Sequence, residues 1–354
     1  MKQEDLNKIL EAAAKAPSGD NVQPWRFEII GDNSDRLKVY NDPAVDNSLY
    51  NYRQTASFIA HGALIKNIEI AALHLGYTCN YADVSGQPNL VADITLTAVT
   101  PQPQELYESI FLRATNRKPY RTEKILSQIT DLANRFGSSN ADPQIKIIDD
   151  PALVEQVAAI VSLNEKLVLE NYYLHKFLFD HVTWNAGQAS AHPQGLYLKT
   201  LEISKPAEIV FKIASKWSRV TLFNRFGLSK KVAKENFEVY KKSGGFAAVL
   251  VNSAEQPDLL GIGKIIQEFW LSLTKRGFYA HPLTGIIFLN HAIELGIQHY
   301  LSEKEITEIK KAYVALEDLF GAKGKHILFL MRIGTAAAPS AYSGRISFKS
   351  LMKS

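Results

Sequence analysis

Two short polar runs, about 90 residues apart, carry the side chains of this sequence that are best suited to bind a cofactor. The first, Ser18-Gly19-Asp20-Asn21-Val22-Gln23-Pro24-Trp25, gathers hydroxyl, amide and aromatic groups in one loop. The second, Arg113-Ala114-Thr115-Asn116-Arg117, places a hydroxyl between two guanidinium groups. Guanidinium groups are planar, permanently charged donors that bind phosphate bidentately. Together the two runs predict a site for a phosphate-bearing cofactor.

The elements around the first run place it at a corner of the fold. Apolar residues recur with helical spacing over residues 6–14, and Pro17 ends that helix just before Ser18. Residues 26–30 and 36–40 alternate as strands on either side of Gly31-Asp32-Asn33, a turn composition. The pattern predicts a helix, the polar loop and then a β-hairpin, in which Trp25 anchors the loop in the core.

The rest of the chain indicates that this arrangement is repeated. Two mostly apolar segments, residues 54–76 and 259–277, read as buried helices that end at a glycine, and each is followed by an aromatic residue. Further strands are expected at 91–99, 245–251 and 326–334. Pro101 and Pro103 mark a boundary between two halves near residue 101.

A basic segment, residues 205–242, lies within the second half and holds ten Lys or Arg against three Glu. Aromatic and aliphatic residues interleave with these charges. The pattern favours either an amphipathic helical cap over a pocket or a solvated helical insertion. Attachment to a membrane surface is less favoured, because Gly227 interrupts the segment and the sequence shows no clean apolar face.

Composition excludes several classes of protein and of site. A net charge of +4 is too small for a dedicated nucleic-acid binder. Cys79 is the only cysteine, so an internal disulfide and a four-cysteine zinc site are excluded, which fits a reducing, cytoplasmic location. Residues 1–5 lack the pattern of a secretory leader, and no later segment approaches the ~20 apolar residues of a membrane span.

Metal and dinucleotide motifs are also lacking. His175 and His181 are six residues apart and lie on different faces of a helix, so the histidines are interpreted as structural and no metal site is expected. Gly261-Ile262-Gly263 lies inside a helical pattern without the third glycine of a dinucleotide-binding loop.

The first run resembles the Ser-x-x-Asn-x-Gln-Pro-Trp element of the flavin-dependent nitroreductase family, and Arg113-x-Thr115-x-Arg117 is similar to the Arg-x-Ser/Thr-x-Arg/Lys element of the same family. Ordinary members are homodimers in which the arginine element comes first; here the order is inverted. The second half offers only Gly137-Ser138-Ser139-Asn140 after its arginines, with no Gln-Pro-Trp. Each half lacks what the other keeps, which resembles the duplicated, single-chain Acg-type branch.

The resemblance implies an α+β fold of two nitroreductase-like halves, each with a mainly antiparallel sheet packed by long core helices, forming an intrachain pseudo-dimer. The halves are expected at residues 1–100 and 101–354, the second with a helical, locally basic insertion at about 160–244. A duplicated chain needs no partner to complete its site, so a monomer or weak homodimer is expected.

The resemblance also implies one composite site for flavin mononucleotide (FMN). His281-Pro282-Leu283-Thr284-Gly285 is similar to the family's Pro-x-Glu-Gly turn, whose backbone amides face flavin N5, with Thr284 in place of Glu. Arg345 stands where the family places a C-terminal basic residue on the phosphate. The residues expected at the cofactor are Ser18, Asn21, Gln23, Arg113, Thr115, Arg117, Pro282, Leu283, Thr284, Gly285 and Arg345. Of these, Asn21 and Gln23 are also suited to brace the loop.

Two functions follow from the resemblance, and a third stays open. The first is an oxidoreductase that transfers hydride from NADPH or NADH through FMN to a nitro compound, a quinone or a similar small molecule; the flavin carries the chemistry and no side chain acts as a nucleophile. The second is a non-catalytic flavin-binding or storage protein whose insertion covers the flavin. The third is a scaffold that has lost flavin.

Overall fold

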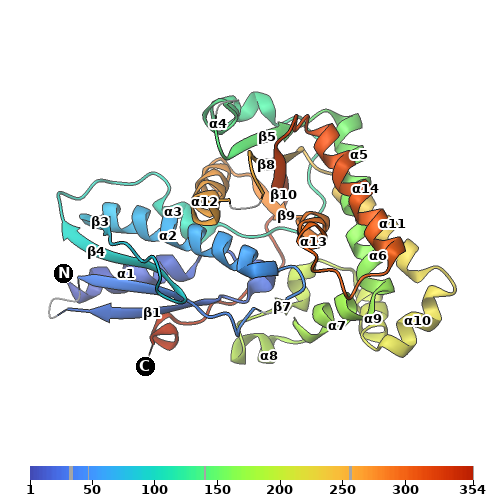
Figure 1. Ribbon diagram of the computed structural model, residues 1–354, viewed down its shortest axis with the longest axis horizontal. Helices are drawn as coiled ribbons and strands as arrows, with labels where there is room; N and C mark the ends of the chain where they lie inside the picture. Colours follow the sequence, from blue (N-terminus) through green and yellow to red (C-terminus); the bar gives the residue numbers. More distant parts are fainter. Residues whose placement is uncertain (32–34, 47, 139–140, 255–256, 354) are drawn as a thin grey trace.

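Two antiparallel sheets, flanked by helices, form the framework of the protein in the computed structural model, which describes residues 1–31, 35–46, 48–138, 141–254 and 257–353 (Figure 1). The strands are β1 (Trp25–Ile30), β2 (Arg36–Asn41), β3 (Tyr77–Tyr81), β4 (Leu90–Ala98), β5 (Gln144–Ile148), β6 (Val182–Thr183), β7 (Leu196–Tyr197), β8 (Gly245–Val251), β9 (Tyr279–Pro282) and β10 (His326–Gly334). The α-helices are α1 (Gln3–Ala14), α2 (Thr55–Leu75), α3 (Tyr107–Leu112), α4 (Thr130–Phe136), α5 (Pro151–Val161), α6 (Leu163–Glu170), α7 (Tyr172–Asp180), α8 (Ala186–Ala191), α9 (Lys205–Ala214), α10 (Trp217–Asn224), α11 (Leu228–Tyr240), α12 (Leu259–Lys275), α13 (Gly285–Glu294) and α14 (Glu303–Leu319). Short 3-10 helices are η1 (Gly19–Asn21), η2 (Tyr52–Gln54), η3 (Leu126–Gln128), η4 (Leu198–Leu201) and η5 (Phe348–Leu351).

The two sheets repeat one plan. The first has the order β1-β2-β4-β3 and the second β5-β8-β10-β9, so in each the second strand pairs with the first and the fourth, and the third lies at an edge. Along the chain, a long buried helix connects the second and third strands of each sheet. This helix is α2 in the first half and α12 in the second. The predicted α+β fold with two similar halves is therefore confirmed.

The local predictions around the first polar run also hold. The helix ends at Ala14 and the strands pair as an antiparallel hairpin, although Asp32 and Asn33 of its predicted turn lie outside the described residues. Ser139 and Asn140, singled out in the second half, likewise lie outside them. Trp25 is fully buried in the first half's core, as expected of an anchor.

The two halves meet where α2 crosses α12 at a pair of glycines. A Cβ on Gly62 would overlap the carbonyl of Leu260, and a Cβ on Gly263 would overlap the carbonyl of Ile59, so only hydrogen fits at either position. A buried hydrogen bond of 2.7 Å from Gln267 Nε2 to Asn67 Oδ1 crosses the same contact. The halves are thus packed backbone to backbone.

Segments of the chain pass from one half to the other. Ile110 of α3 lies in the core of the first half, although it follows residue 101. Beyond β10 the chain returns to the first sheet, where Met352 forms a parallel bridge with Phe27 and Leu351 is fully buried (Figure 1). This return carries Arg345 past the loop of Ser18.

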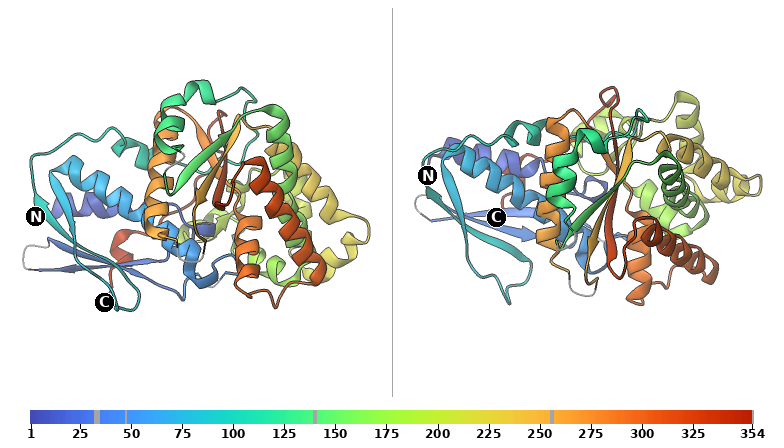
Figure 2. Two further views of the ribbon diagram at one scale, coloured as in Figure 1. Left: turned by 45° about the horizontal axis from the view of Figure 1, so that its top comes forward. Right: turned by 90° about the horizontal axis from the view of Figure 1, so that it is seen from above.

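The chain between β5 and β8 contains α5 to α11 and includes the expected insertion at about 160–244. Helices α5, α6 and α9 to α11 gather with α13 and α14 on the side of the second sheet away from α12, whereas α8 lies nearer the first sheet (Figures 1 and 2). The helices of the basic segment, α9 to α11, pack against α6 and α7. They form the end of the molecule farthest from the first sheet (Figure 1).

One helical segment meets the length and hydropathy of a membrane span, contrary to the prediction that none would. Within the described residues this is Tyr52–Leu75, and 72% of its most apolar window is buried inside the protein. Burial of this kind is typical of a core helix, which is the role α2 has in the crossing with α12.

Replacement of Gly263 by alanine tests the helix crossing. The added methyl group must push α12 away from α2, so Gly263→Ala is expected to lower the free energy of unfolding by about 2 kcal/mol, measured by urea denaturation. Gly187→Ala in α8 is the control, because its added Cβ meets only the side-chain oxygen of Asn185 at 3.3 Å. Equal stability of the two variants would contradict the close crossing.

His61 on α2 gives the fold a pH dependence. Its ring is fully buried, with Nε2 3.1 Å from Asn41 Oδ1, and burial lowers its pKa from 6.5 to about 3. The unfolded chain therefore binds a proton below pH 6.5 that the folded chain does not. The stability due to neutral His61 is present above that pH and declines by up to about 1.4 kcal/mol per unit as the pH falls toward the folded pKa. His61→Gln is expected to make the curve of unfolding free energy against pH shallower in this range. Curves of equal slope for the variant and the unaltered protein would contradict the assignment of this pH dependence to His61.

Candidate functional site

One cavity brings together segments that are far apart in the sequence. It has about 590 Å³ of atom-free space, part of it open to solvent, and lies between the loop after α1, the arginine run after α3, the η4 region of the insertion and the returning C-terminal segment. Its lining residues are Pro17, Ser18, Asp20, Asn21, Arg113, Ala114, Thr115, Arg117, Leu196, Thr200, Ala341, Tyr342, Ser343 and Arg345. Ser18, Asn21, Arg113, Thr115, Arg117 and Arg345 were all predicted as site residues, so both polar runs line the same space.

Arg113 is held by contacts with both halves. It directly follows α3, and its guanidinium carbon lies 4.5 Å from the ring centroid of Trp270 on α12. Its Nη2 donates to the carbonyl of Lys15 at the end of α1 over 3.2 Å. The side chain is buried, but Nε has no hydrogen-bond partner among the described residues. One donor of a fixed cation is thus left unsatisfied.

Arg345 reaches the same cavity from the returning segment. Its Nη1 donates to Asn21 Oδ1, and its Nε is buried without a partner in the described part of the chain. Burial lowers the pKa of Arg345 to about 10, and burial together with the like charge of Arg345 lowers the pKa of Arg113 to about 9. The pKa values of both arginines are lowered because each charge is buried without a nearby anion to compensate it.

Arg117 lies farther along the same run. Thr115 forms a parallel β-bridge with Ala280 of β9, so the arginine run lies beside the second sheet. Arg117 Nη1 donates to the carbonyl of Thr200 over 3.1 Å. Burial lowers the pKa of Arg117, against the opposing effect of Asp20. In the described residues no Asp or Glu forms an ion pair with Arg113, Arg117 or Arg345. A buried charge without a partner is costly, so the arrangement suits an anionic ligand.

The Ser18 loop has a strained backbone that hydrogen bonds hold in place. Asp20, Asn21 and Gln23 have φ values of 42°, 58° and 55°, in the left-handed region that non-glycine residues rarely adopt. Gln23 N donates to Ser18 Oγ at 3.0 Å, which leaves the hydroxyl proton of Ser18 free to donate into the cavity. Burial raises the pKa of Asp20, so this carboxyl keeps its proton to a higher pH than usual.

Asn21 and Gln23 tie the loop to two other segments. Asn21 Nδ2 donates to the carbonyl of Pro193 at 2.7 Å, and Gln23 Oε1 accepts from Ile346 N at 2.9 Å. Gln23 is fully buried and does not belong to the cavity lining, whereas Asn21 does. Their bracing role is confirmed, and a cofactor contact by Gln23 stays a prediction.

The predicted turn at Pro282, Leu283, Thr284 and Gly285 is not part of the cavity lining. Leu283 N donates to the carbonyl of Leu330 at 2.9 Å, so this amide is engaged within the second sheet. Asn164 of the insertion packs against the α-carbon of Gly285, which begins α13. Only the amides of the first helical turn, which have no partner within the helix, stay available there.

Arg332 of β10 supports the site and was missed in the sequence. It is fully buried, with its guanidinium carbon 4.2 Å from the ring centroid of Tyr120, and its Nη2 donates to the carbonyl of Lys118 at 3.0 Å. Its Nε donates to His281 Nδ1 at 3.1 Å. Arg332 thus fixes the chain just after Arg117. The sequence feature that could have indicated its role is an arginine within the mostly apolar strand at 326–334.

The insertion contributes Leu196 and Thr200, not the basic helices expected to form the cap. Residues of α9 to α11 are missing from the cavity lining. Both residues are buried, but nothing in the sequence around 196–200 marks them as cavity-lining residues. Among the described residues no group of three His, Cys, Asp or Glu side chains could hold a metal ion.

Comparison with known proteins supports the motif-based interpretation in its N-terminal part. The family model of the nitroreductase family matches residues 1–55, which include the Ser18 loop and the hairpin, so the resemblance is confirmed for that segment. The uncharacterized protein MT1398 of Mycobacterium tuberculosis (strain CDC 1551 / Oshkosh) is 21% identical over 346 residues. The match covers 95% of this chain but 46% of that protein, so the chain spans less than half of its relative's length.

Two solved structures give remote matches. The FMN-dependent nitroreductase NfnB of Mycobacterium smegmatis, solved in complex with NADPH, is 13% identical with a TM-score of 0.35, over 66% of this chain and 88% of that chain. A nitroreductase of Desulfitobacterium hafniense, solved with bound FMN, is 11% identical with a TM-score of 0.36, over 69% of this chain and 95% of that chain.

Inorganic phosphate tests the cavity as an anion site. Phosphate is expected to raise the melting temperature more than chloride at equal ionic strength, because it binds only the folded chain. Arg345→Gln keeps a donor for Asn21 but removes the charge, so it is expected to weaken phosphate binding at least about tenfold. The control is Arg121→Gln, at an exposed arginine of the same region. The same phosphate-induced shift in both variants would contradict the placement.

Proposed function

We propose that the cavity binds FMN and that the protein is a flavin-dependent oxidoreductase of nitroreductase type, which takes hydride from NADPH or NADH and passes it to a nitro compound, a quinone or a similar small molecule. The observation that carries the proposal is the convergence of Arg113, Arg117 and Arg345 on one cavity, where none of them forms an ion pair with an Asp or Glu of the described residues.

The phosphate end of FMN fits the donors present. Arg113 and Arg345 each have a buried Nε without a partner in the described chain, and a phosphate dianion would satisfy both and offset their mutual repulsion. Ser18 and Thr115 line the same space, and their hydroxyls suit the phosphate or the ribityl chain. This donor set agrees with the match of residues 1–55 to the nitroreductase family.

The remaining residues would orient the flavin ring. When bound, FMN supplies the hydride transfer itself. Arg117 would place a positive charge near the ring and so favour its reduced form, and Thr200 fixes that guanidinium through its carbonyl. Thr284 and Gly285, at the start of α13, stay proposed as amide donors toward the ring, with Pro282 and Leu283 shaping the turn.

The site would be composite within a single chain. Ser18 belongs to the first half, whereas Arg113 and Arg117 precede the second sheet and Arg345 follows it. We therefore propose two halves divided near residue 101, one FMN per chain, a monomer or weak homodimer and a cytoplasmic location.

A second function, flavin storage, has its own supporting observation. The segment 193–200 borders the cavity and is tied to the Ser18 loop. The carbonyl of Pro193 accepts from Asn21 and Gln23, and Gln194 Nε2 donates to the carbonyl of Val22 at 2.6 Å. Because Leu196 and Thr200 line the cavity, the segment 193–200 would limit access of NADPH to a bound flavin.

Anaerobic spectroscopy separates these functions. The purified protein, loaded with FMN, is expected to show the visible absorption of oxidised flavin and to lose it on addition of NADPH or NADH. Colour that persists with both nucleotides but is lost with dithionite would favour storage over catalysis. A protein that does not retain FMN would contradict both.

Arg113→Ala tests the phosphate contact directly. The variant is expected to bind FMN at least about tenfold more weakly, since a charge-assisted hydrogen bond contributes about 1.5 to 3 kcal/mol, as measured by quenching of flavin fluorescence. Arg121→Ala serves as the matched control. Unchanged FMN affinity in Arg113→Ala would show that the phosphate lies elsewhere.

A further inference from the structure

The turn between α10 and α11 lies at one end of the molecule (Figure 1), and large apolar side chains are exposed there. Phe226 is 84% exposed, Leu222 50% and Phe223 41%. Leu222 and Phe223 each lie three or four residues from Arg219 and from Phe226, so the four residues share one side of α10 and its continuation. On the adjacent α9, Ile209 is also 62% exposed. Exposed apolar side chains therefore lie together here beside exposed basic ones, an arrangement that the sequence pattern did not reveal.

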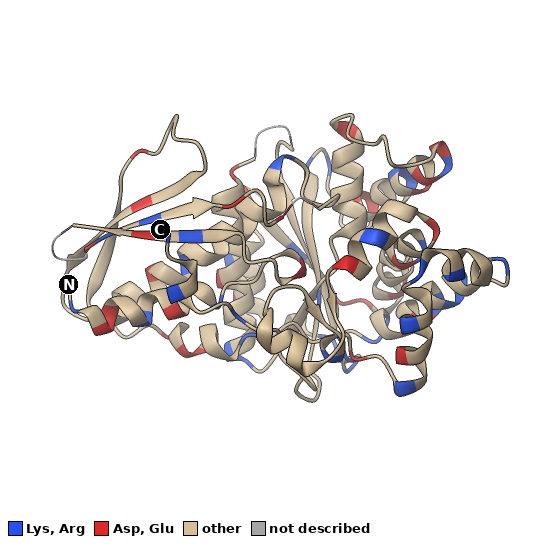
Figure 3. Ribbon diagram, turned by 90° about the horizontal axis from the view of Figure 1, so that it is seen from below, with Lys and Arg blue, Asp and Glu red and all other residues tan. Residues whose placement is uncertain are grey.

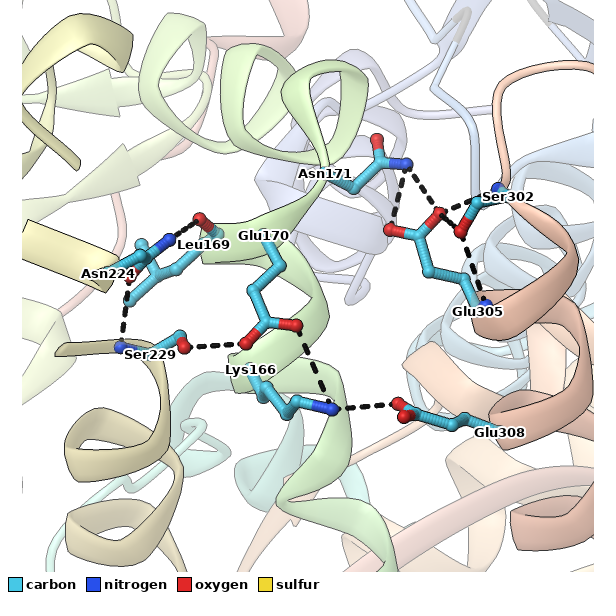
Figure 4. Close-up of polar contacts among 9 residues, drawn as sticks. All are labelled: Lys166, Leu169, Glu170, Asn171, Asn224, Ser229, Ser302, Glu305 and Glu308. Atoms are coloured by element: carbon cyan, nitrogen blue, oxygen red, sulfur yellow. Dashed lines mark hydrogen bonds and ion pairs between the residues drawn. The ribbon is translucent and has the colours of Figure 1, made fainter. Parts of the chain in front are cut away.

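The turn is braced from beneath, so Phe226 is not exposed through a loose loop. Figure 4 shows its polar residues pointing inward: Asn224 Nδ2 donates to the carbonyl of Leu169 at 2.6 Å and Ser229 Oγ donates to Glu170 at 2.6 Å. Asn224 Oδ1 also accepts from Ser229 N at 3.1 Å, which closes the turn.

The base of this turn is fixed to the rest of the helical layer. Lys166 of α6 lies 3.7 Å from Glu170 and 2.8 Å from Glu308 on α14 (Figure 4). Gly227, which the sequence suggested would interrupt the segment, has a φ of 84° and allows the sharp turn into α11. The side chains of Asn224 and Ser229 are thus bonded inside the protein, whereas Phe226 is exposed.

The surroundings of the exposed side chains are strongly basic. Residues 205–231 contain seven Lys or Arg and one Glu, a net charge of +6, whereas the whole chain carries +4, so the remaining residues carry −2. Of these basic residues, Lys205, Lys212, Lys216, Arg219, Arg225, Lys230 and Lys231 are all exposed. Figure 3 shows Lys and Arg along this end of the molecule.

We propose that this surface, formed by α9, α10 and the turn to α11, docks on an anionic lipid bilayer, with Leu222, Phe223 and Phe226 entering the interface and the surrounding Lys and Arg contacting lipid headgroups. Apolar side chains that project beyond a basic surface match the interface of a charged membrane, in which each Lys or Arg is attracted to acidic lipids. A nucleic acid would use the charge but offers no apolar layer to receive these side chains. The proposal does not depend on flavin.

Vesicle co-sedimentation tests the docking surface with the full chain. The protein is expected to bind vesicles of phosphatidylcholine mixed with phosphatidylglycerol, to bind vesicles of phosphatidylcholine alone at least tenfold more weakly, and to dissociate as salt is added. Two variants separate the contributions: Leu222→Ser/Phe226→Ser for insertion and Arg219→Glu/Arg225→Glu for charge. Each is expected to lower the partition coefficient at least tenfold.

A control variant on another helix tests whether loss of vesicle binding is specific to the proposed surface. Val314→Ser/Lys310→Glu changes an exposed apolar and an exposed basic residue of α14 and is expected to bind like the unaltered protein. Circular dichroism establishes that all variants are folded. Failure to bind the mixed vesicles, equal binding to both kinds of vesicle, or unchanged binding by either site variant would overturn the proposal, as would tighter binding to a DNA duplex than to the vesicles.

Discussion

The contact between α2 and α12 at Gly62 and Gly263 sets the separation of the two halves, and the rest of the molecule depends on that separation. The Ser18 loop is attached to the half that contains α2, whereas Arg113 rests on Trp270 of α12. Any side chain at the crossing would move these two parts of the cavity relative to each other. The close packing of two backbones therefore influences the geometry of a cavity to which both helices are connected.

The cavity also shows how a fold can hold positive charges together before a ligand arrives. Arg113 is stabilised by an aromatic face and one carbonyl, Arg117 by a carbonyl and the nearby Asp20, and Arg345 by an amide oxygen. These partners fix the direction of each guanidinium without neutralising it in the way a close ion pair would. The remaining charge is the basis of the proposed affinity for an anion.

Sequence reasoning was most accurate where local chemistry decides the structure. The strands at 245–251 and 326–334 and the helix that ends before Gly76 follow from apolar runs and a glycine with φ of 90°, and all lie where expected. The meeting of the two polar runs was also predicted, because each half lacked one element. By contrast, Leu196 and Thr200 reach the cavity only through the path of the insertion, which no local pattern encodes. The position of the 282–285 turn likewise depends on how α13 packs beside Asn164.

The return of the chain from β10 to the first sheet has a consequence for the order of synthesis. On the ribosome, the Ser18 loop and the arginine run emerge well before Arg345 and the residues that pair with Phe27. The hairpin edge of the first sheet and the third cation of the cavity are therefore both completed by one late segment. If the cavity binds an anion as proposed, a nascent chain would complete that site only after both sheets have been made, because Arg345 follows β10.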